Sequence, residues 1–297
     1  MTDSVELVLD AQADMGEGPI WHARTQRLYW VNCAAGEVHV FDPQAKTDRT
    51  IRVGQAVGTV VPRRKGGVML AVKHGFASLD LDTEALTLLA DPEADQPQNV
   101  FNDGKCDPAG RFWAGTISDG PPFIPGAGSL YCLDTGGQVS RKVGQVSMSN
   151  GLVWSHDKAT FYFIDSLAYT VDAFDYDDAT GEISNRRVAI TIPKECGVPD
   201  GMTIDADGML WVAGWGRGQV CRWDPSQARL LQSIELPVSQ VTACAFGGPQ
   251  LDELYITSAR SGAYGLDQAA LAREPQAGGI FKARPGVRGT EAFEFAG

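Results

Sequence analysis

The sequence has no excess of basic residues, no long hydrophobic run and almost no helical periodicity. Its 25 lysines and arginines are outnumbered by 37 aspartates and glutamates, which gives a net charge of −12. An acidic chain without a basic tract argues against nucleic acid and an anionic membrane as partners. No apolar run approaches the roughly 20 residues of a membrane span, and the opening stretch, MTDSVELVLD, lacks an apolar signal core. We therefore expect a cytoplasmic protein without a membrane partner.

Motifs for thiol and serine chemistry are absent as well. The six cysteines are scattered and form no Cys-x-x-Cys pair, so we expect reduced, mostly buried thiols rather than disulfides or a zinc site. Neither a Gly-x-Ser-x-Gly elbow nor a serine triad is visible. These absences argue against a serine hydrolase.

The chain does contain a repeat of short strand-like segments. Successive segments start 40, 44, 49, 49 and 44 residues apart, and each follows a turn-like stretch. Most are followed by a second run that ends in Asp, as expected for neighbouring strands. The six segments are RLYWVN from Arg27, GVMLAV from Gly67, RFWAGT from Arg111, TFYFID from Thr160, MLWVAG from Met209 and ELYITS from Glu253.

A period of roughly 40–50 residues with several strands in each repeat is typical of a β-propeller. Six copies predict an all-β fold, a six-bladed β-propeller that occupies residues 1–297 as one domain. To close the ring, we expect the run at residues 5–10 to supply a strand to the last blade. One modest helical segment is expected near residues 266–274. A β-sandwich with irregular loops is the alternative, but the regular spacing argues against it.

Polar residues recur at a fixed distance before these segments. Nine to eleven residues before the start of each segment lies a position that is equivalent in all six repeats, which we call the position of equivalent phase. These positions are Glu17, Gly58, Asn102, Asn150, Asp200 and Thr242. In a propeller, equal phase means equal height along the axis. The six positions should therefore surround one mouth of the central channel, where a rigid scaffold often carries functional groups.

The residue types at this mouth predict a cation site. The carboxylates of Glu17 and Asp200 would repel each other and raise a pKa, and a divalent cation would remove that cost. Oxygen donors of this kind suit Ca²⁺, Mg²⁺ or Mn²⁺, and Glu17, Asn150 and Asp200 could all bind through oxygen, with water in the remaining positions. The alternative is that NDG, SNG and PDG are ordinary turn formers.

Several long blocks resemble the senescence marker protein/gluconolactonase (regucalcin-like) family of sugar lactonases. They occur in the family order and cover nearly the whole chain. The blocks are GEGPIW, FNDGKCDPAGRFWAGT, SNGLVWSHDKATFYFIDS, PDGMTIDADGMLWVA and TACAFGGPQLDELYITSAR.

This resemblance implies a six-bladed propeller with one divalent metal ion at the channel mouth. On this basis the metal ligands are Glu17, Asn150 and Asp200, and Asn102 touches the substrate or a metal-bound water. Ca²⁺ is the expected ion, with Zn²⁺, Mn²⁺ and Fe²⁺ as alternatives.

The chain departs from the family at one substrate-binding position. Animal members carry an arginine directly before FNDGK, where it contacts the sugar, whereas this chain has Val100. Valine offers no hydrogen-bond donor to a hydroxyl, so we expect a less polar sugar edge, such as that of a pentonolactone or a deoxy-sugar lactone. Asp119 lies near the family's acidic sugar contact, and residues 118–128 look like a rim.

The expected function is therefore hydrolysis of a small-molecule sugar (aldono)lactone. A metal ion can polarise the lactone carbonyl, while Asp200 accepts a proton from water and Asn102 orients the lactone or the water. No organic cofactor is needed. The alternatives are a metal-dependent esterase or phosphotriesterase-like propeller and a non-catalytic calcium-binding propeller. We expect a monomer or a weak homo-oligomer.

Overall fold

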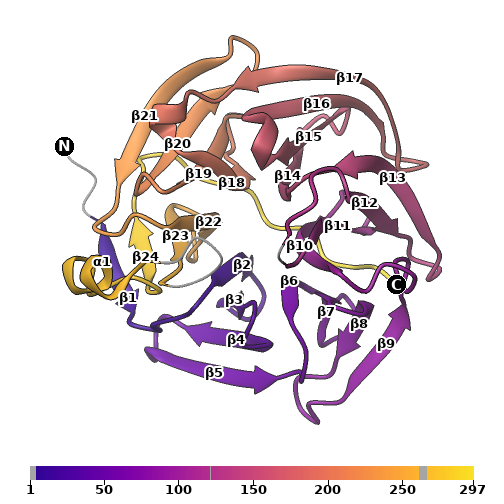
Figure 1. Ribbon diagram of the computed structural model, residues 1–297, viewed down its shortest axis with the longest axis horizontal. Coiled ribbons are helices and arrows are strands. Elements are labelled where there is room, and N and C mark those ends of the chain that lie inside the picture. The colour runs from indigo at the N-terminus through magenta and orange to yellow at the C-terminus, as the bar shows by residue number, and fades with distance from the viewer. Residues whose placement is uncertain (1–4, 121, 261–265) are drawn as a thin grey trace.

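Six four-stranded antiparallel sheets surround a central axis in the computed structural model of the protein, which describes residues 5–120, 122–260 and 266–297 (Figure 1). Each sheet is one blade, with its strands in order from the channel to the outer edge. The prediction of an all-β, six-bladed propeller is confirmed.

The blades follow one another along the chain. The first three contain β2 (Gly16–His22), β3 (Arg27–Asn32), β4 (Glu37–Asp42) and β5 (Thr47–Arg52); β6 (Val57–Pro62), β7 (Val68–Val72), β8 (Gly75–Leu79) and β9 (Leu86–Ala90); and β10 (Asn99–Cys106), β11 (Phe112–Ser118), β12 (Gly128–Leu133) and β13 (Val139–Val146). The next two contain β14 (Ser149–Trp154), β15 (Thr160–Asp165), β16 (Thr170–Asp177) and β17 (Glu182–Thr191); and β18 (Val198–Ile204), β19 (Leu210–Trp215), β20 (Gln219–Asp224) and β21 (Arg229–Glu235). The sixth contains β22 (Val241–Gly247), β23 (Glu253–Ser258), β24 (Ile280–Ala283) and β1 (Glu6–Leu9).

In the part of the chain that the structure describes, helices lie only in connections between strands. The predicted helix is present as α1 (Gln268–Arg273), and the side chain of Asp267 caps it by accepting a hydrogen bond from Ala270 N at 2.7 Å. The described residues also contain two 3₁₀ turns, η1 (Ser166–Ala168) and η2 (Lys194–Cys196). Within the described ranges, no helix has the length and apolar character needed to cross a membrane.

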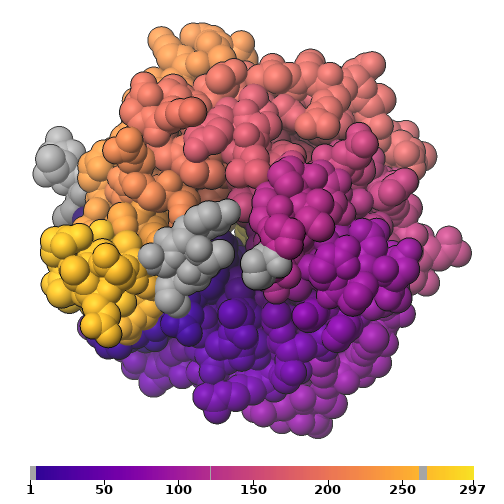
Figure 2. Space-filling view, in the orientation of Figure 1, coloured from indigo at the N-terminus to yellow at the C-terminus, as the bar shows by residue number. Residues whose placement is uncertain are grey.

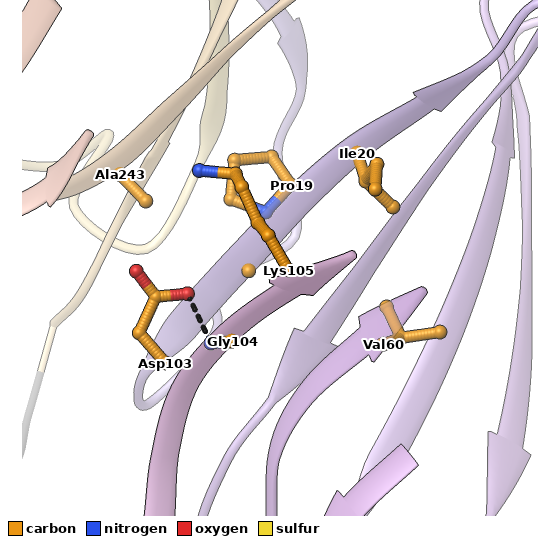
Figure 3. Close-up of a pocket in the computed structure, with 8 residues that line it drawn as sticks. Pro19, Ile20, Val60, Asp103, Gly104, Lys105 and Ala243 are labelled. Atoms are coloured by element: carbon orange, nitrogen blue, oxygen red, sulfur yellow. Dashed lines mark hydrogen bonds between the residues drawn. The ribbon is translucent and has the colours of Figure 1, made fainter. Parts of the chain in front are cut away.

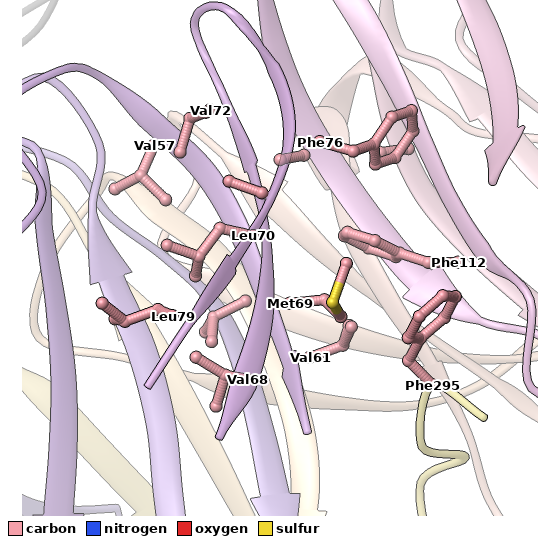
Figure 4. Packing of buried hydrophobic residues seen from close by; sticks show 14 of the residues in the cluster. Val57, Val61, Val68, Met69, Leu70, Val72, Phe76, Leu79, Phe112 and Phe295 are labelled. Atoms are coloured by element: carbon pink, nitrogen blue, oxygen red, sulfur yellow. The ribbon is translucent and has the colours of Figure 1, made fainter. Parts of the chain in front are cut away.

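The six repeated segments form the second strand of each blade. Every residue of β7 and of β23 is buried, because neighbouring blades cover both faces of these strands. In Figure 4, Met69 and Leu70 lie on opposite sides of β7, and Phe112 of the next blade lies on the Met69 side. Burial on both faces explains why these segments read as nearly continuous apolar runs.

The N-terminal run closes the ring, as predicted. Strand β1 pairs antiparallel with β24, with Leu7 opposite Phe281 and Leu9 opposite Ile280. The last blade therefore combines three strands from the end of the chain with one from its beginning. This pairing joins the first and last repeats without a further element.

Deletion of residues 1–10 is expected to lower the free energy of unfolding by about 3 kcal/mol or more. The deletion removes ladder hydrogen bonds worth about 1 kcal/mol each and the packing of Leu7 and Leu9 against the core, and it leaves β24 as an open edge. Urea unfolding followed by tryptophan fluorescence measures the change. An unaltered unfolding midpoint would show that this strand does not hold the ring closed.

The C-terminal segment, residues 284–297, links several blades at one end of the channel. It passes behind the ring in the view of Figure 1. Gly289 N donates to Leu251 O at 2.8 Å, Phe295 N to Pro62 O at 2.9 Å and Ala296 N to Gly110 O at 3.0 Å. Phe295 is 3% exposed and packs in the core shown in Figure 4. Pro62 is the last residue of β6, and Gly110 and Leu251 follow the ends of β10 and β22. The C-terminal segment therefore lies at the end of the channel where the innermost strands end.

Candidate metal centre

The six positions of equivalent phase all lie on the innermost strands of the blades. Each falls within the first four residues of its strand, so all six are at the same end of the channel. They are Glu17 on β2, Gly58 on β6, Asn102 on β10, Asn150 on β14, Asp200 on β18 and Thr242 on β22. Figure 2 views the ring from this end and shows a narrow hollow at its centre.

Each innermost strand changes register at or directly beside this position. The shifts fall between Glu17 and Ile20, Phe101 and Gly104, Ser149 and Leu152, and Pro199 and Met202, with shorter ones at Gly58 and Thr242. A β-bulge leaves residues unpaired and redirects their side chains. The alternative that NDG, SNG and PDG form turns is therefore wrong, because these residues lie in bulged strands.

Glycines next to the bulged residues allow adjacent innermost strands to approach closely. A Cβ at Gly151 would lie 2.5 Å from Cβ of Met202, and one at Gly201 would lie 2.3 Å from Cβ of Ala243. Any larger residue would push the blades apart. Close packing of these strands brings polar groups from separate repeats to one place.

Glu17 and Asp200 interact electrostatically within this ring. Each residue is 7% exposed. Burial, followed by the neighbouring charge of Asp103, raises the pKa of Glu17 to about 8. Burial raises the pKa of Asp200 well above its ordinary range, with Glu17 and then Asp103 as further causes. The structure thus brings the two predicted carboxylates together, and their ionised forms are costly.

The two asparagines are in direct contact. Nδ2 of Asn102 donates to Ser149 O at 2.7 Å and to Oδ1 of Asn150 at 2.9 Å. Nδ2 of Asn150 donates to Oγ of Ser166 at 2.8 Å. Both partners of Asn102 Nδ2 are acceptors, which fixes the orientation of this amide. Oδ1 of Asn102 and the second lone pair of Asn150 Oδ1 thus remain available to a ligand.

A third carboxylate, Asp103, belongs to this cluster and was missed by the sequence analysis. Asp103 is 5% exposed, and its Oδ1 accepts a hydrogen bond from Gly104 N at 2.7 Å. Burial raises the pKa of Asp103, and the positive charge of Lys105 opposes this effect. Counting one position per repeat selected Asn102 and passed over its neighbour in NDG. The bulge, which leaves both residues unpaired, is the signal that identifies Asp103.

Cys33 lies near the same carboxylates. Burial raises the pKa of its thiol well above the usual range, and the charges of Glu17, Asp200 and Asp103 add to this effect. Cys33 is therefore held as the neutral thiol. All six cysteines lie in the described residues and are free, as predicted.

The residues present fit a hard divalent cation. Three buried carboxylates, Glu17, Asp103 and Asp200, repel one another, and the donors of this cluster are oxygen atoms, which Ca²⁺, Mg²⁺ and Mn²⁺ prefer. Within residues 5–120, 122–260 and 266–297, no three His, Cys, Asp or Glu side chains are grouped tightly enough to enclose an ion by themselves. An ion held by Glu17 and Asp200 would complete its coordination with the amide oxygen of Asn150 and with water.

Val100 and Asp119 lie beside this mouth. Val100 is partly buried and pairs with Ile117 of β11, while the backbone N of the exposed Asp119 donates to Gln98 O at 2.7 Å. Phe101, next to Val100, packs into the core against Phe76 with ring centroids 4.9 Å apart. Strand alternation then places Val100 on the face away from that core. Residue 121 of the expected rim at 118–128 lies outside the described residues.

Fold and site together define a six-bladed β-propeller with an acidic channel mouth. Residues 15–260 match the model of the SMP-30/Gluconolactonase/LRE-like region. The chain is 42% identical over 297 residues to regucalcin from Oryctolagus cuniculus, covering 99% of this chain and 98% of that protein. This protein therefore belongs to the SMP-30/gluconolactonase family.

Solved structures of similar proteins share the whole fold. A luciferin-regenerating enzyme superimposes with a TM-score of 0.91 at 33% identity over 99% of both chains. A calcium-binding regucalcin from Agrobacterium tumefaciens superimposes with a TM-score of 0.93 at 28% identity, over 99% of this chain and 98% of that one. The blade arrangement is thus common to relatives that differ at most positions.

Proposed function

We propose that this protein is a divalent-cation-dependent lactonase that opens a sugar lactone to the corresponding sugar acid. The observation that carries the proposal is the convergence of Glu17, Asn150 and Asp200 from three different blades at one channel mouth. Membership of a family that includes gluconolactonases supports the reaction class. The calcium-binding regucalcin among the similar structures supports Ca²⁺ as the cation.

In this proposal Glu17, Asn150 and Asp200 hold the cation, which when bound acts as a Lewis acid toward the lactone carbonyl. Asp200 also serves as the general base. With the cation bound, Asp200 is ionised, and a carboxylate beside the cation is placed to accept a proton from water. It takes a proton from the attacking water as the water oxygen bonds to the carbonyl carbon, and the proton passes to the ring oxygen when the ring C–O bond breaks.

Asn102 orients the reactants. Its Nδ2 is fully used by Ser149 O and Asn150 Oδ1, so it presents Oδ1 as an acceptor. An acceptor at this position binds a sugar hydroxyl or one proton of the attacking water. Holding either in place lowers the entropic part of the barrier.

A panel of lactones, measured with and without a chelator, tests the proposed function. We expect hydrolysis of at least one aldonolactone, loss of this activity in the chelator and its return with Ca²⁺; Zn²⁺, Mn²⁺ and Fe²⁺ should be compared in the same assay. Aryl esters and phosphotriesters belong in the panel. Hydrolysis of these compounds alone would favour the esterase alternative, and Ca²⁺ binding without any turnover would favour the non-catalytic one.

Val100 is proposed to set the preference among sugars. Substitution Val100→Arg is expected to raise the rate on glucono-1,5-lactone relative to a pentonolactone by roughly three- to tenfold. One hydrogen bond to a hydroxyl is worth about 0.5–1.5 kcal/mol, and more for a charged donor, while a factor of ten needs about 1.4 kcal/mol. Ratios of kcat/KM on the two lactones measure the effect.

Val100→Leu is the matched control, because it enlarges the side chain without adding a donor and should leave the ratio unchanged. A wild-type enzyme that already prefers gluconolactone would contradict this role for Val100. So would a ratio that Val100→Arg leaves unaltered. Either result would move the specificity determinants to the rim at 118–128.

A further inference from the structure

A small cavity lies inside the channel beside the carboxylate cluster. Its volume is about 10 Å³, and its walls come from four innermost strands, with Gly18 on β2, Val60 on β6, Asp103 on β10 and Ala243 on β22 (Figure 3). This volume is close to the minimum that one water molecule occupies. Gly18 adjoins Glu17 and donates its backbone N–H to Oε2 of Glu17 at 3.1 Å, so the cavity borders the proposed metal ligands.

One oxygen of Asp103 has its hydrogen-bonding capacity unused. Oδ1 accepts from Gly104 N, whereas Oδ2 is buried and has no hydrogen-bond partner among the described residues. A buried carboxylate oxygen without a donor is costly. Figure 3 shows this carboxylate reaching the cavity, where a water molecule would supply the missing hydrogen bond.

Lys105 places a positive charge at the same cavity. It lines the cavity two residues after Asp103, and its Nζ donates to the backbone oxygen of Met202 on β18. The bond to Met202 holds the ammonium group within the channel. Its charge acts on both Glu17 and Asp103, so it partly offsets the negative charge that a cation would meet.

We propose that Asp103 raises the affinity of this site for a divalent cation without coordinating the ion directly, because it acts through one water in this cavity. Lys105 lowers the same affinity. The inference rests on the cation site of the proposed function, but not on the lactonase reaction. Asp103 contributes its negative charge and the orientation of the water, while Glu17, Asn150 and Asp200 remain the direct ligands. Lys105 offsets part of the negative charge of Glu17 and Asp103.

Titration calorimetry of the chelator-treated full chain with CaCl₂ tests this proposal without any lactone. Asp103→Asn keeps the shape of the side chain and removes its charge, and we expect the Ca²⁺ association constant to fall at least tenfold, which is 1.4 kcal/mol. Lys105→Gln retains a donor for Met202 O and removes the positive charge, so it should tighten Ca²⁺ binding at least threefold. If Asp103→Asn fails to fold, Lys105→Gln still tests the proposal in the opposite direction.

Glu93→Gln is the matched control. Glu93 is a buried carboxylate that accepts hydrogen bonds from Thr116, Tyr131 and Asn99, away from the channel cavity. The same carboxylate-to-amide change there should leave Ca²⁺ affinity within twofold of the wild type. Melting curves of all variants confirm that the comparison is made on folded protein.

Terbium luminescence distinguishes action through water from direct coordination. Lifetimes in H₂O and D₂O give the number of waters on bound Tb³⁺, and Asp103→Asn should leave that number unchanged. A gain of one water in this variant would make Asp103 a direct ligand and overturn the proposal, as would an unchanged Ca²⁺ affinity. A wild type that binds Ca²⁺ but hydrolyses no lactone would refute the proposed function and leave this inference standing. A wild type that binds no divalent cation would refute both.

Discussion

Substitution Asp200→Ala is expected to abolish divalent-cation binding and lactone hydrolysis together. Asp200 combines two proposed roles, since its carboxylate binds the cation and accepts the proton of the attacking water. General-base catalysis alone contributes about 10²–10⁴-fold, and loss of the cation removes several kcal/mol of charge stabilisation. We therefore expect kcat/KM to fall by about 10³-fold or more. Elemental analysis of the purified variant and initial rates on the best lactone measure the two effects.

Two other variants define the contrast. Asn102→Ala should retain the cation and lose rate, because Asn102 orients reactants and is not a proposed ligand. Asp224→Asn, on the third strand of the same blade as Asp200, should keep both properties, since Asp224 accepts hydrogen bonds within its own turn from Ser226 N and Oγ. A fully metal-loaded Asp200→Ala protein would show that the ligand assignment is wrong.

The blades could be predicted because each repeat buries the same strand in the same way. Segments such as RLYWVN and ELYITS form second strands that neighbouring blades cover on both faces, and β3 and β23 begin where these segments begin. Ring closure was predictable for a related reason. The run at residues 5–10 resembles a strand but precedes the first repeat, so it was free to pair with the last blade, where it forms the fourth strand.

Comparing the positions nine to eleven residues before each repeated segment located the site, because equivalent positions of the repeats lie at the same level along the propeller axis. It correctly selected one residue on every innermost strand, including Glu17 and Asp200. It could not select Asp103, because a bulge directs two adjacent residues out of the ladder and the period provides one position per repeat. The role of Lys105 depends on its contact with Met202, 97 residues away, which no local pattern encodes.

The contacts of the C-terminal segment could not be predicted from the sequence either. Alternation in EAFEFA resembles a strand, yet Phe295 makes only an isolated parallel bridge to Arg63 and packs into the core of a distant blade. Glu294 meets Arg24 of the first blade at 2.8 Å. These contacts join segments more than 200 residues apart. These contacts form only when the ring is closed. The sequence repeat predicts the number of blades, but it does not predict which residues of distant blades meet.

Stability of the metal-free protein is expected to fall as pH rises, and Ca²⁺ is expected to reverse this loss. Burial raises the pKa of Glu17 from its ordinary value of 4.5 to about 8, so the folded state binds a proton more tightly than the unfolded state. The resulting stabilisation is fully present below about pH 4.5 and is lost as pH rises through about 8. At 1.36 kcal/mol per pKa unit, Glu17 accounts for at most about 5 kcal/mol, and Asp200 acts in the same direction.

Calorimetric melting of chelator-treated protein at pH 6 and pH 9 measures this effect. We expect a melting temperature lower at pH 9 by up to about 10 °C, since 1 kcal/mol corresponds to about 2–4 °C in domains of 150–250 residues and to somewhat less in longer chains. Saturating Ca²⁺ should raise the melting temperature more at pH 9 than at pH 6, because the cation competes with the proton for the same carboxylates. Glu17→Gln removes one of the titrating groups, so in the chelator this variant should lose less melting temperature between pH 6 and pH 9 than the wild type, and Asp200 accounts for the remaining loss. Equal melting temperatures for the wild type at pH 6 and pH 9 would contradict a buried, protonated Glu17, and a Ca²⁺ effect independent of pH would place the bound cation away from this carboxylate.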